Sequence, residues 1–136
     1  MAGTLLLQVV TPERRVVEAE ADSVELPGSE GYLGILPGHT ALVTLLKTGV
    51  LSYKRGGSRE AYAVSAGLAE IADDRVSVLA DSAQGAAEID ASAAERERAE
   101  TEKQMGSASN ETLPEIRARF ELAQARLAVA SARSRS

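Results

Sequence analysis

The chain is short, acidic and free of cysteine, and these properties exclude several classes of protein. Its 136 residues carry a formal net charge of −5, so the broad basic face that binds a nucleic-acid backbone is not expected. Without cysteine there are no disulfides, thiolate nucleophiles or cysteine-bound metals, and with a single histidine, His39, a metal site would depend on carboxylates. An aromatic content of 3% argues against a surface that stacks bases.

The sequence also lacks membrane-spanning and targeting signals. No stretch comes near the roughly 18 consecutive apolar residues that a spanning helix requires. The first residues, MAGTLLLQVVTPERR, lack the basic start and long apolar centre of a signal peptide. We therefore expect a soluble chain without a targeting segment.

Residues 1–86 are predicted to form an antiparallel β-sandwich, or flattened barrel. Short runs enriched in β-branched residues are separated by turn signals such as Pro37-Gly38, Gly56-Gly57 and Asp73-Asp74. Many short strands without a helical period are typical of such folds. We expect strands at residues 5–12, 14–21, 22–28, 31–38, 41–46, 49–54, 59–66, 67–72 and 75–80, with a break at Pro27-Gly28.

Residues 87–136 are predicted to form a C-terminal αα-hairpin. Their composition shifts to alanine, glutamate and arginine, which are strong helix formers. We expect helices at residues 89–104 and 114–135, joined by a turn at residues 105–111. Thr112 and Glu115 have the spacing of a capping box at the start of the second helix.

This hairpin is expected to be weak on its own. The second helix carries an apolar stripe of Ile116, Phe120, Ala123, Leu127 and Ala130. The first helix offers little beyond Ile89 and several alanines, and burying alanine releases less free energy than burying leucine. The hairpin therefore needs a second surface, which is the sandwich, another protein, or each at different times.

Charge is segregated between the two helices. Residues 88–103 carry a net charge of −3, and residues 115–136 carry +3. Two interpretations stay open. Either the helices are solvated surfaces that attract each other weakly, or the basic helix leaves and docks on an acidic partner.

The sequence contains no recognisable catalytic constellation. It has no phosphate-binding loop, dinucleotide fingerprint, zinc-protease motif or nucleophile elbow. His39 follows Pro37-Gly38, and no acidic residue lies between Glu30 and Glu60, which favours a turn histidine over a general base. Asp73-Asp74 favours turn geometry over acid–base chemistry.

Three segments of the chain resemble a known family. They are VVTPERRVVEAEADSVELPGSEGYLGILPGHTALVTLLKTGVL at residues 9–51, AVSAGLAEIADDRVSVLAD at residues 63–81, and EID at residues 88–90. Together they closely resemble the epsilon subunit of F-type ATP synthases, over essentially the whole chain. The LPG-EG-LGILPGH core of the first segment is specific, because several glycines, prolines and apolar positions must coincide there.

The resemblance implies a non-catalytic subunit of the central stalk, or rotor. In the family, the sandwich binds the gamma subunit and the ring of membrane c-subunits, and so couples proton flow to rotation and ATP synthesis. By position in the motif, the residues expected to meet these partners are Gly31, Leu33, Gly34, Leu36, Pro37 and His39. No catalytic residue, metal or cofactor is implied.

The resemblance also implies a regulatory hairpin. In the family, the hairpin can extend along gamma and block ATP hydrolysis near an acidic segment of the catalytic beta subunits. The expected contacts are Arg117, Arg119, Arg126 and Arg133. A static hairpin that only braces the coupling subunit is the alternative. The expected location is the cytoplasmic face of a bacterial inner membrane, reached through the complex, with the plastid thylakoid as the alternative.

One family feature is degraded in this sequence. Some members bind ATP on the folded hairpin through Ile/Leu-Asp-x-x-Arg-Ala and two arginines one turn apart. Ile89, Asp90 and Arg126 match this motif, but Ala93 and Leu122 stand where the other two arginines belong. Losing two cations from a phosphate site weighs against an ATP-sensing switch, the third candidate function.

Overall fold

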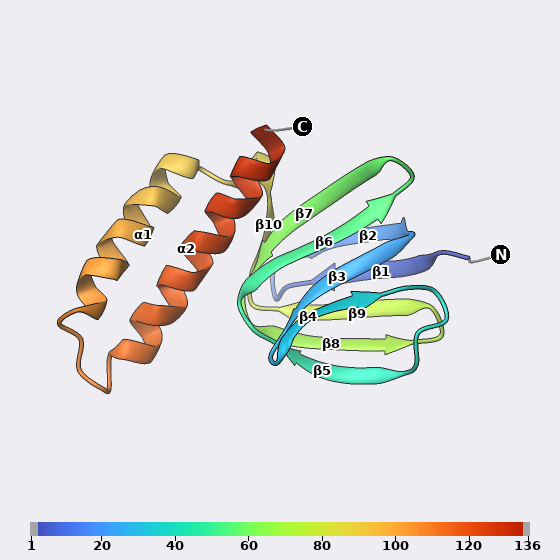
Figure 1. The fold of residues 1–136 in the computed structure, drawn as a ribbon, viewed down its shortest axis with the longest axis horizontal. Helices are drawn as coiled ribbons and strands as arrows, with labels where there is room; N and C mark the ends of the chain where they lie inside the picture. The colour runs from blue at the N-terminus through green and yellow to red at the C-terminus, as the bar shows by residue number, and fades with distance from the viewer. Residues whose placement is uncertain (1–2, 135–136) are drawn as a thin grey trace.

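The computed structural model describes residues 3–134, and the side chains of residues 3–132. It consists of a rolled β-sheet and a hairpin of two α-helices that lies against one end of the sheet (Figure 1). The strands are β1 (Leu5–Val10), β2 (Arg15–Ala21), β3 (Ser23–Gly28), β4 (Gly31–Ile35), β5 (Leu42–Leu46), β6 (Gly49–Arg55), β7 (Ser58–Val64), β8 (Gly67–Ala72), β9 (Arg75–Ala80) and β10 (Ala83–Gly85). The helices are a 3-10 turn, η1 (Ala86–Glu88), then α1 (Ala91–Met105) and α2 (Leu113–Ser134).

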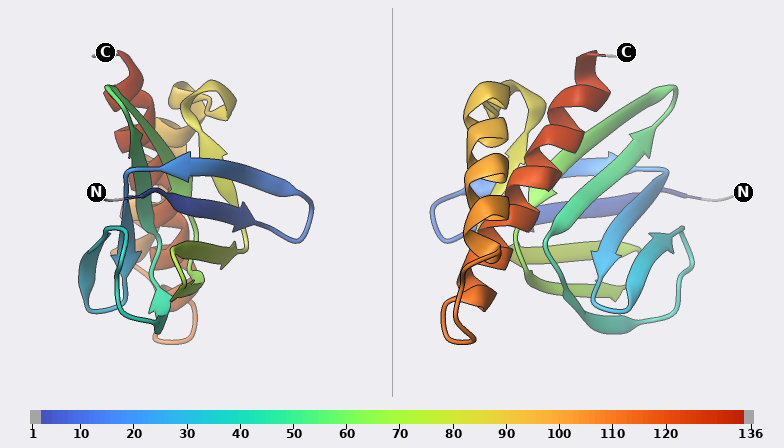
Figure 2. Two further views of the ribbon diagram at one scale, coloured as in Figure 1. Left: turned by 90° about the vertical axis from the view of Figure 1, so that its right-hand side faces the viewer. Right: turned by 60° about the vertical axis from the view of Figure 1, so that its left-hand side comes forward.

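The sheet folds over itself into two layers, which confirms the predicted sandwich (Figure 2). Its strand order is β10-β7-β6-β3-β5-β8-β9-β1-β2, with β4 paired to β3. The β1–β9 pair is parallel, and the other pairs are antiparallel. The amide of Asp22, just after β2, donates to the carbonyl of Lys54 in β6, so the last strand of the path returns to an earlier one. The sheet is therefore nearly closed, which leaves little unpaired edge.

The core lies between the two layers and is built by alternation along each strand. In β1, Leu5, Leu7 and Val9 are buried while the residues between them are partly exposed, as expected for a strand with one face on the core. The large side chains with almost no exposed surface are Leu5, Leu7, Val9, Val24, Leu26, Ile35, Leu51, Val64, Ile71, Val76 and Val78 in the sandwich. This alternation is why the sequence pattern predicted these strands.

The two helices are antiparallel neighbours, and α2 lies between α1 and the sheet (Figures 1 and 2). Asp90 is the N-cap of α1, where its Oδ1 accepts a 3.0 Å hydrogen bond from the Ala93 amide. Ala94 and Thr101 of α1 are buried, as is Ala123 of α2. The buried Thr101 hydroxyl donates to the carbonyl of Glu97, one turn earlier, so it has a partner inside the helix.

Two local expectations were wrong. The strand β10 is absent from the prediction, and its residues Ala83–Gly85 pair with β7 after the chain leaves β9. The Pro27-Gly28 signal does mark the end of β3 at Gly28, and Pro27 still faces Tyr32 within the β3–β4 ladder. The Thr112 hydroxyl does not complete a capping box with Glu115. It accepts instead from the Ser109 amide, because the preceding turn curls back towards it.

Candidate functional site

A row of exposed leucines crosses the outer face of the sandwich. Leu45 of β5 faces Leu68 of β8, which faces Leu79 of β9, which in turn faces Val10 of β1. Directly paired residues share a face of the sheet, so the four side chains form one continuous apolar row. Leu45 is 64% exposed and Leu79 is 56% exposed. A contiguous exposed apolar surface of this kind is typical of a docking site for another protein.

A tight turn projects a further leucine from the sandwich. Leu36, Pro37, Gly38 and His39 form it, and the His39 amide donates a 3.1 Å hydrogen bond to the Leu36 carbonyl. Gly38 has a φ of +86°, the value of the third position of a type II turn, where proline is favoured at the second position. Leu36 is 62% exposed. Its own residues therefore favour one turn conformation, and the turn carries an apolar side chain into solvent.

His39 has a structural partner in the residue that follows the turn. Its Nδ1 lies 2.7 Å from the Thr40 carbonyl oxygen, and the ring is partly exposed. The nearest carboxylate bonded to the turn belongs to Asp74, which binds the Gly38 amide and not the imidazole. This arrangement agrees with the interpretation of His39 as a turn residue.

The strand before this turn holds the other residues predicted to meet partners. Gly31 and Gly34 lie in β4, and Gly34 is exposed. Leu33 is only partly buried and packs against the core, so it supports β4 from inside. The hydroxyl of Tyr32 accepts a 3.1 Å hydrogen bond from the Val50 amide of β6. β4 is thus fixed by its pairing to β3 and by a side chain that reaches β6.

The hairpin docks on the sandwich through small residues. Ala125 and Val129 of α2 are buried against Ala63 of β7, with Val50 of β6 and Ile89 at the margin of the same cluster. Alanines contribute little buried area, so this hairpin–sandwich seam is weak for its length. Ala125 and Val129 do not belong to the apolar stripe that the sequence predicts, because they lie on a different face of α2.

Two of the four predicted arginines are engaged in the folded hairpin. Arg119 donates two hydrogen bonds to the carboxylate of Glu97 in α1, of 2.9 and 3.2 Å. Arg126 donates 2.6 Å from its Nε to Oε1 of Gln84 in β10. Arg117 is exposed, and the side chain of Arg133 lies outside the described residues. The basic helix therefore uses its central arginines to bind the rest of the chain.

The Arg119–Glu97 pair shifts the pKa of both groups. The hydrogen bonds from Arg119 lower the pKa of Glu97, and Glu97 raises the pKa of Arg119. Elsewhere on the hairpin, Arg98 lies between Glu95 and Glu102 on the same helix, so its charge is used within α1. Although the two helices carry opposite net charges, Arg119–Glu97 is the one ion pair between them in the described part of the chain.

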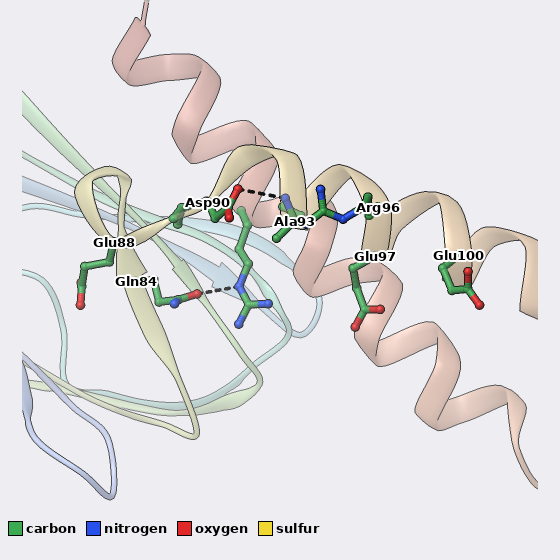
Figure 3. Close-up of a pocket in the computed structure, with 10 residues that line it drawn as sticks. Gln84, Glu88, Asp90, Ala93, Arg96, Glu97 and Glu100 are labelled. Carbon is green, nitrogen blue, oxygen red and sulfur yellow. Dashed lines mark hydrogen bonds between the residues drawn. The ribbon is translucent and has the colours of Figure 1, made fainter.

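A shallow pocket of about 580 Å³ lies where α1, α2 and β10 meet, at the position of the degraded nucleotide motif (Figure 3). Its volume is adequate for a small ligand. Its charged lining residues are Glu88, Asp90, Arg96, Glu97, Glu100 and Arg126. Carboxylates outnumber guanidinium groups, and Arg126 is already bonded to Gln84. Figure 3 shows Ala93 facing the pocket with no cationic side chain, so these residues do not fit a triphosphate.

Residues 3–134 show neither a membrane-spanning helix nor a metal-binding cluster. No helix in this range is both long and apolar enough to cross a bilayer. No group of three or more histidine, cysteine or acidic side chains in the same range is arranged to hold a metal ion.

Comparison with known proteins identifies the family. A family model described as "ATP synthase, Delta/Epsilon chain, beta-sandwich domain" matches residues 4–86. The ATP synthase epsilon chain of Myxococcus xanthus is 40% identical over 121 residues, covering 89% of this chain and 85% of the relative. The ATP synthase epsilon chain of Solibacter usitatus is 42% identical over 134 residues, covering 96% of this chain and 98% of the relative.

The fold also matches a solved assembly. A chain in the Euglena gracilis mitochondrial ATP synthase structure, which contains OSCP, F1 and the c-ring, superposes with a TM-score of 0.81, at 21% identity. The match covers 94% of this chain and 81% of that chain, and at this identity it shows the fold alone. The sequence relatives and the family model carry the assignment further: the chain belongs to the family of ATP synthase epsilon chains, which are accessory and not catalytic subunits.

Proposed function

We propose that this chain is a central-stalk subunit of an F-type ATP synthase, and that it couples proton movement through the c-ring to ATP synthesis. We also propose that its hairpin inhibits ATP hydrolysis when it leaves the sandwich. The observation that carries the proposal is the combination of a nearly closed sandwich with exposed apolar surface and a hairpin held to it by a weak seam.

The proposed partners of the sandwich are the gamma subunit and the c-ring. The leucine row and the Leu36–His39 turn offer apolar surface on a rigid scaffold, which a partner can bury without ordering new backbone. Membrane association then comes only through the complex. By the same proposal the chain lies at the cytoplasmic face of a bacterial inner membrane.

The proposed partners of the released hairpin are the catalytic beta subunits. Arg119 and Arg126 are bonded to Glu97 and Gln84 in the folded state, so an acidic partner would compete for the same guanidinium groups. Such competition makes the folded and released states alternatives, and an acidic partner shifts the balance by its greater affinity for the released state. The alanine-rich seam supports the same conclusion, because little apolar area is lost when α2 leaves.

The test is ATP hydrolysis by the reconstituted catalytic assembly, with the full chain and with a chain that ends at Ala87. The proposal expects both chains to bind and the full chain alone to suppress hydrolysis. Equal hydrolysis with both would leave coupling intact and reject the inhibitory role.

A static hairpin is the second candidate, favoured by the bonds that hold the hairpin in place. Besides Arg126–Gln84, Arg14 pairs with Glu88 of η1 at the base of the hairpin. The double variant Ala63→Cys with Ala125→Cys tests it, because both positions lie in the same buried cluster and the chain has no other cysteine. If the oxidised variant still inhibits as strongly as the reduced one, release of the hairpin is not the mechanism.

An ATP-sensing switch is the weakest candidate, because the pocket lining is acidic and Arg126 is occupied. Equilibrium dialysis of the full chain with ATP decides it. Saturable binding at millimolar ATP or below would revive this candidate.

A further inference from the structure

The turn between β8 and β9 has an unusual backbone for its residues. Asp73 and Asp74 occupy the two positions between the paired residues Ala72 and Arg75, and both have positive φ, 51° and 59°. Two-residue turns of this kind favour asparagine or aspartate followed by glycine, because most other side chains are strained at positive φ. Asp73 suits the first position, but Asp74 stands where glycine is favoured. A side-chain role would explain an aspartate at the second position.

Asp74 has such a role, and Asp73 does not. The Asp74 Oδ1 accepts a 2.7 Å hydrogen bond from the Gly38 amide, 36 residues earlier in the chain. Its carbonyl accepts from the Leu6 amide of β1. Within residues 3–134, the structure gives no side-chain hydrogen bond for Asp73. The two neighbours therefore share a conformation and differ in what their carboxylates do.

The Gly38 amide is the group of the Leu36–His39 turn that most needs an outside partner. In a type II turn, the amide of the fourth residue closes the turn, as His39 does here, while that of the third residue points away. The chain between β4 and β5 contributes no ladder hydrogen bond across residues 36–41 of the described structure. The hydrogen bond from the Gly38 amide to the Asp74 carboxylate thus joins the middle of this turn to the β8–β9 hairpin.

We propose that Asp74 is a positioning residue for the Leu36–His39 turn. Its carboxylate, and not the backbone of the β8–β9 turn, holds the Leu36–His39 turn in the conformation that binds a partner. This inference rests on the proposed function of the turn as a contact with the rotor partners. A turn fixed before binding loses less conformational entropy on binding, so the tether contributes to affinity without touching the partner.

Three variants of the full chain test the proposal. Asp74→Gly suits the backbone but removes the acceptor oxygen. Asp74→Asn keeps an acceptor oxygen and tolerates positive φ. Asp73→Gly is the matched control, because it makes the same backbone change one residue away. Each variant is measured by amide hydrogen exchange at Gly38 and by affinity for a reconstituted complex of gamma and the c-ring.

For Asp74→Gly we expect Gly38 exchange to be faster and affinity weaker, each by about tenfold, the effect of losing one hydrogen bond to a charged group. Asp74→Asn and Asp73→Gly should stay within about threefold of the wild type in both measurements. Unchanged Gly38 exchange in Asp74→Gly would overturn the proposal. So would faster exchange with unchanged affinity, or an equal loss of affinity in Asp73→Gly.

The failure of the proposed function gives a different result. If the wild-type chain does not bind gamma and the c-ring, the function of the turn is rejected, and the positioning role for that partner is rejected with it. Gly38 exchange in the free chain would still report whether Asp74 holds the turn.

Discussion

Arg126 in the middle of α2 donates a 2.6 Å hydrogen bond from its Nε to Oε1 of Gln84 in β10. This bond joins the helical hairpin to β10 of the sandwich, and both residues line the pocket between them. The acceptor is a neutral amide of the same chain. The folded hairpin is therefore held by the chain itself.

Replacing Arg126 should loosen the hairpin without unfolding the sandwich. Arg126→Ala removes a partly buried hydrogen bond, which contributes about 1 kcal/mol, so the released fraction should rise about fivefold. The distance between spin labels placed on α2 and β7 reports this fraction. Arg117→Ala is the matched control, since Arg117 is an exposed arginine of the same helix. Equal release in both variants would show that net charge, and not the Gln84 bond, holds α2.

Val129 tests the apolar half of the same attachment. Val129→Ala removes two buried carbons from the seam with Ala63, at a cost of about 1.5 kcal/mol to docking. Ala128→Ser, at the exposed neighbouring position, should leave docking unchanged. Hydrogen exchange of the β7 amides measures the exposure of the seam. No change in Val129→Ala would mean that the hairpin does not depend on this contact.

The Arg119–Glu97 pair predicts that acid and salt weaken the hairpin. Because Arg119 lowers the pKa of Glu97 from its ordinary value of 4.5, the pair stabilises the fold above that pH and stops doing so as the pH falls through the lowered value. The pair is over one-third exposed on both sides, so the effect is small and screened by salt.

Helical content followed by circular dichroism from pH 6 to pH 3 should therefore show less acid loss in Glu97→Gln than in the wild type. The comparison is made with Glu102→Gln, which removes an exposed carboxylate that pairs within α1 only. If the two variants titrate alike, the interhelical pair does not contribute to the acid sensitivity.

The leucine row should matter for binding and not for stability. Leu45→Ser removes a side chain that is 64% exposed, so the free energy of unfolding should change by less than about 0.5 kcal/mol. If the row docks a rotor partner, affinity for a complex of gamma and the c-ring should fall by about tenfold or more. Leu7→Ala provides the contrast. It empties a fully buried site and should cost about 2–5 kcal/mol of stability.

The position of Gly67, next to Leu68 in β8, has no room for a side chain. A Cβ at this position would lie 2.0 Å from the carbonyl oxygen of Leu79, so β8 and β9 must separate to accept Gly67→Ala. We expect a loss of about 1–3 kcal/mol in thermal or urea unfolding. Gly57→Ala has open space and should be neutral. A neutral Gly67→Ala would contradict the close approach of these strands.

The sequence by itself determined the elements and their order. Nine of the ten strands and both helices follow from local patterns, because strand alternation and helix propensity depend on neighbours in the chain. The Leu36–His39 turn is also local, since Pro37 presets one φ and Gly38 accepts a positive one. The family resemblance rests on the same local segments.

The tertiary structure decided which faces and which distant groups meet. The strand β5 carries leucines on both faces, and β8 carries Leu68 on one face and Ile71 on the other, so alternation alone does not show that Leu45 and Leu68 point outwards. The face of α2 that packs on the sandwich is formed by Ala125 and Val129. Small apolar residues such as these also occur on exposed helix faces, so the sequence does not mark them as buried. The bonds Arg126–Gln84 and Asp74–Gly38 join residues 42 and 36 positions apart. Such contacts depend on the register of the closed sheet and the docking of the hairpin, and no local pattern encodes either.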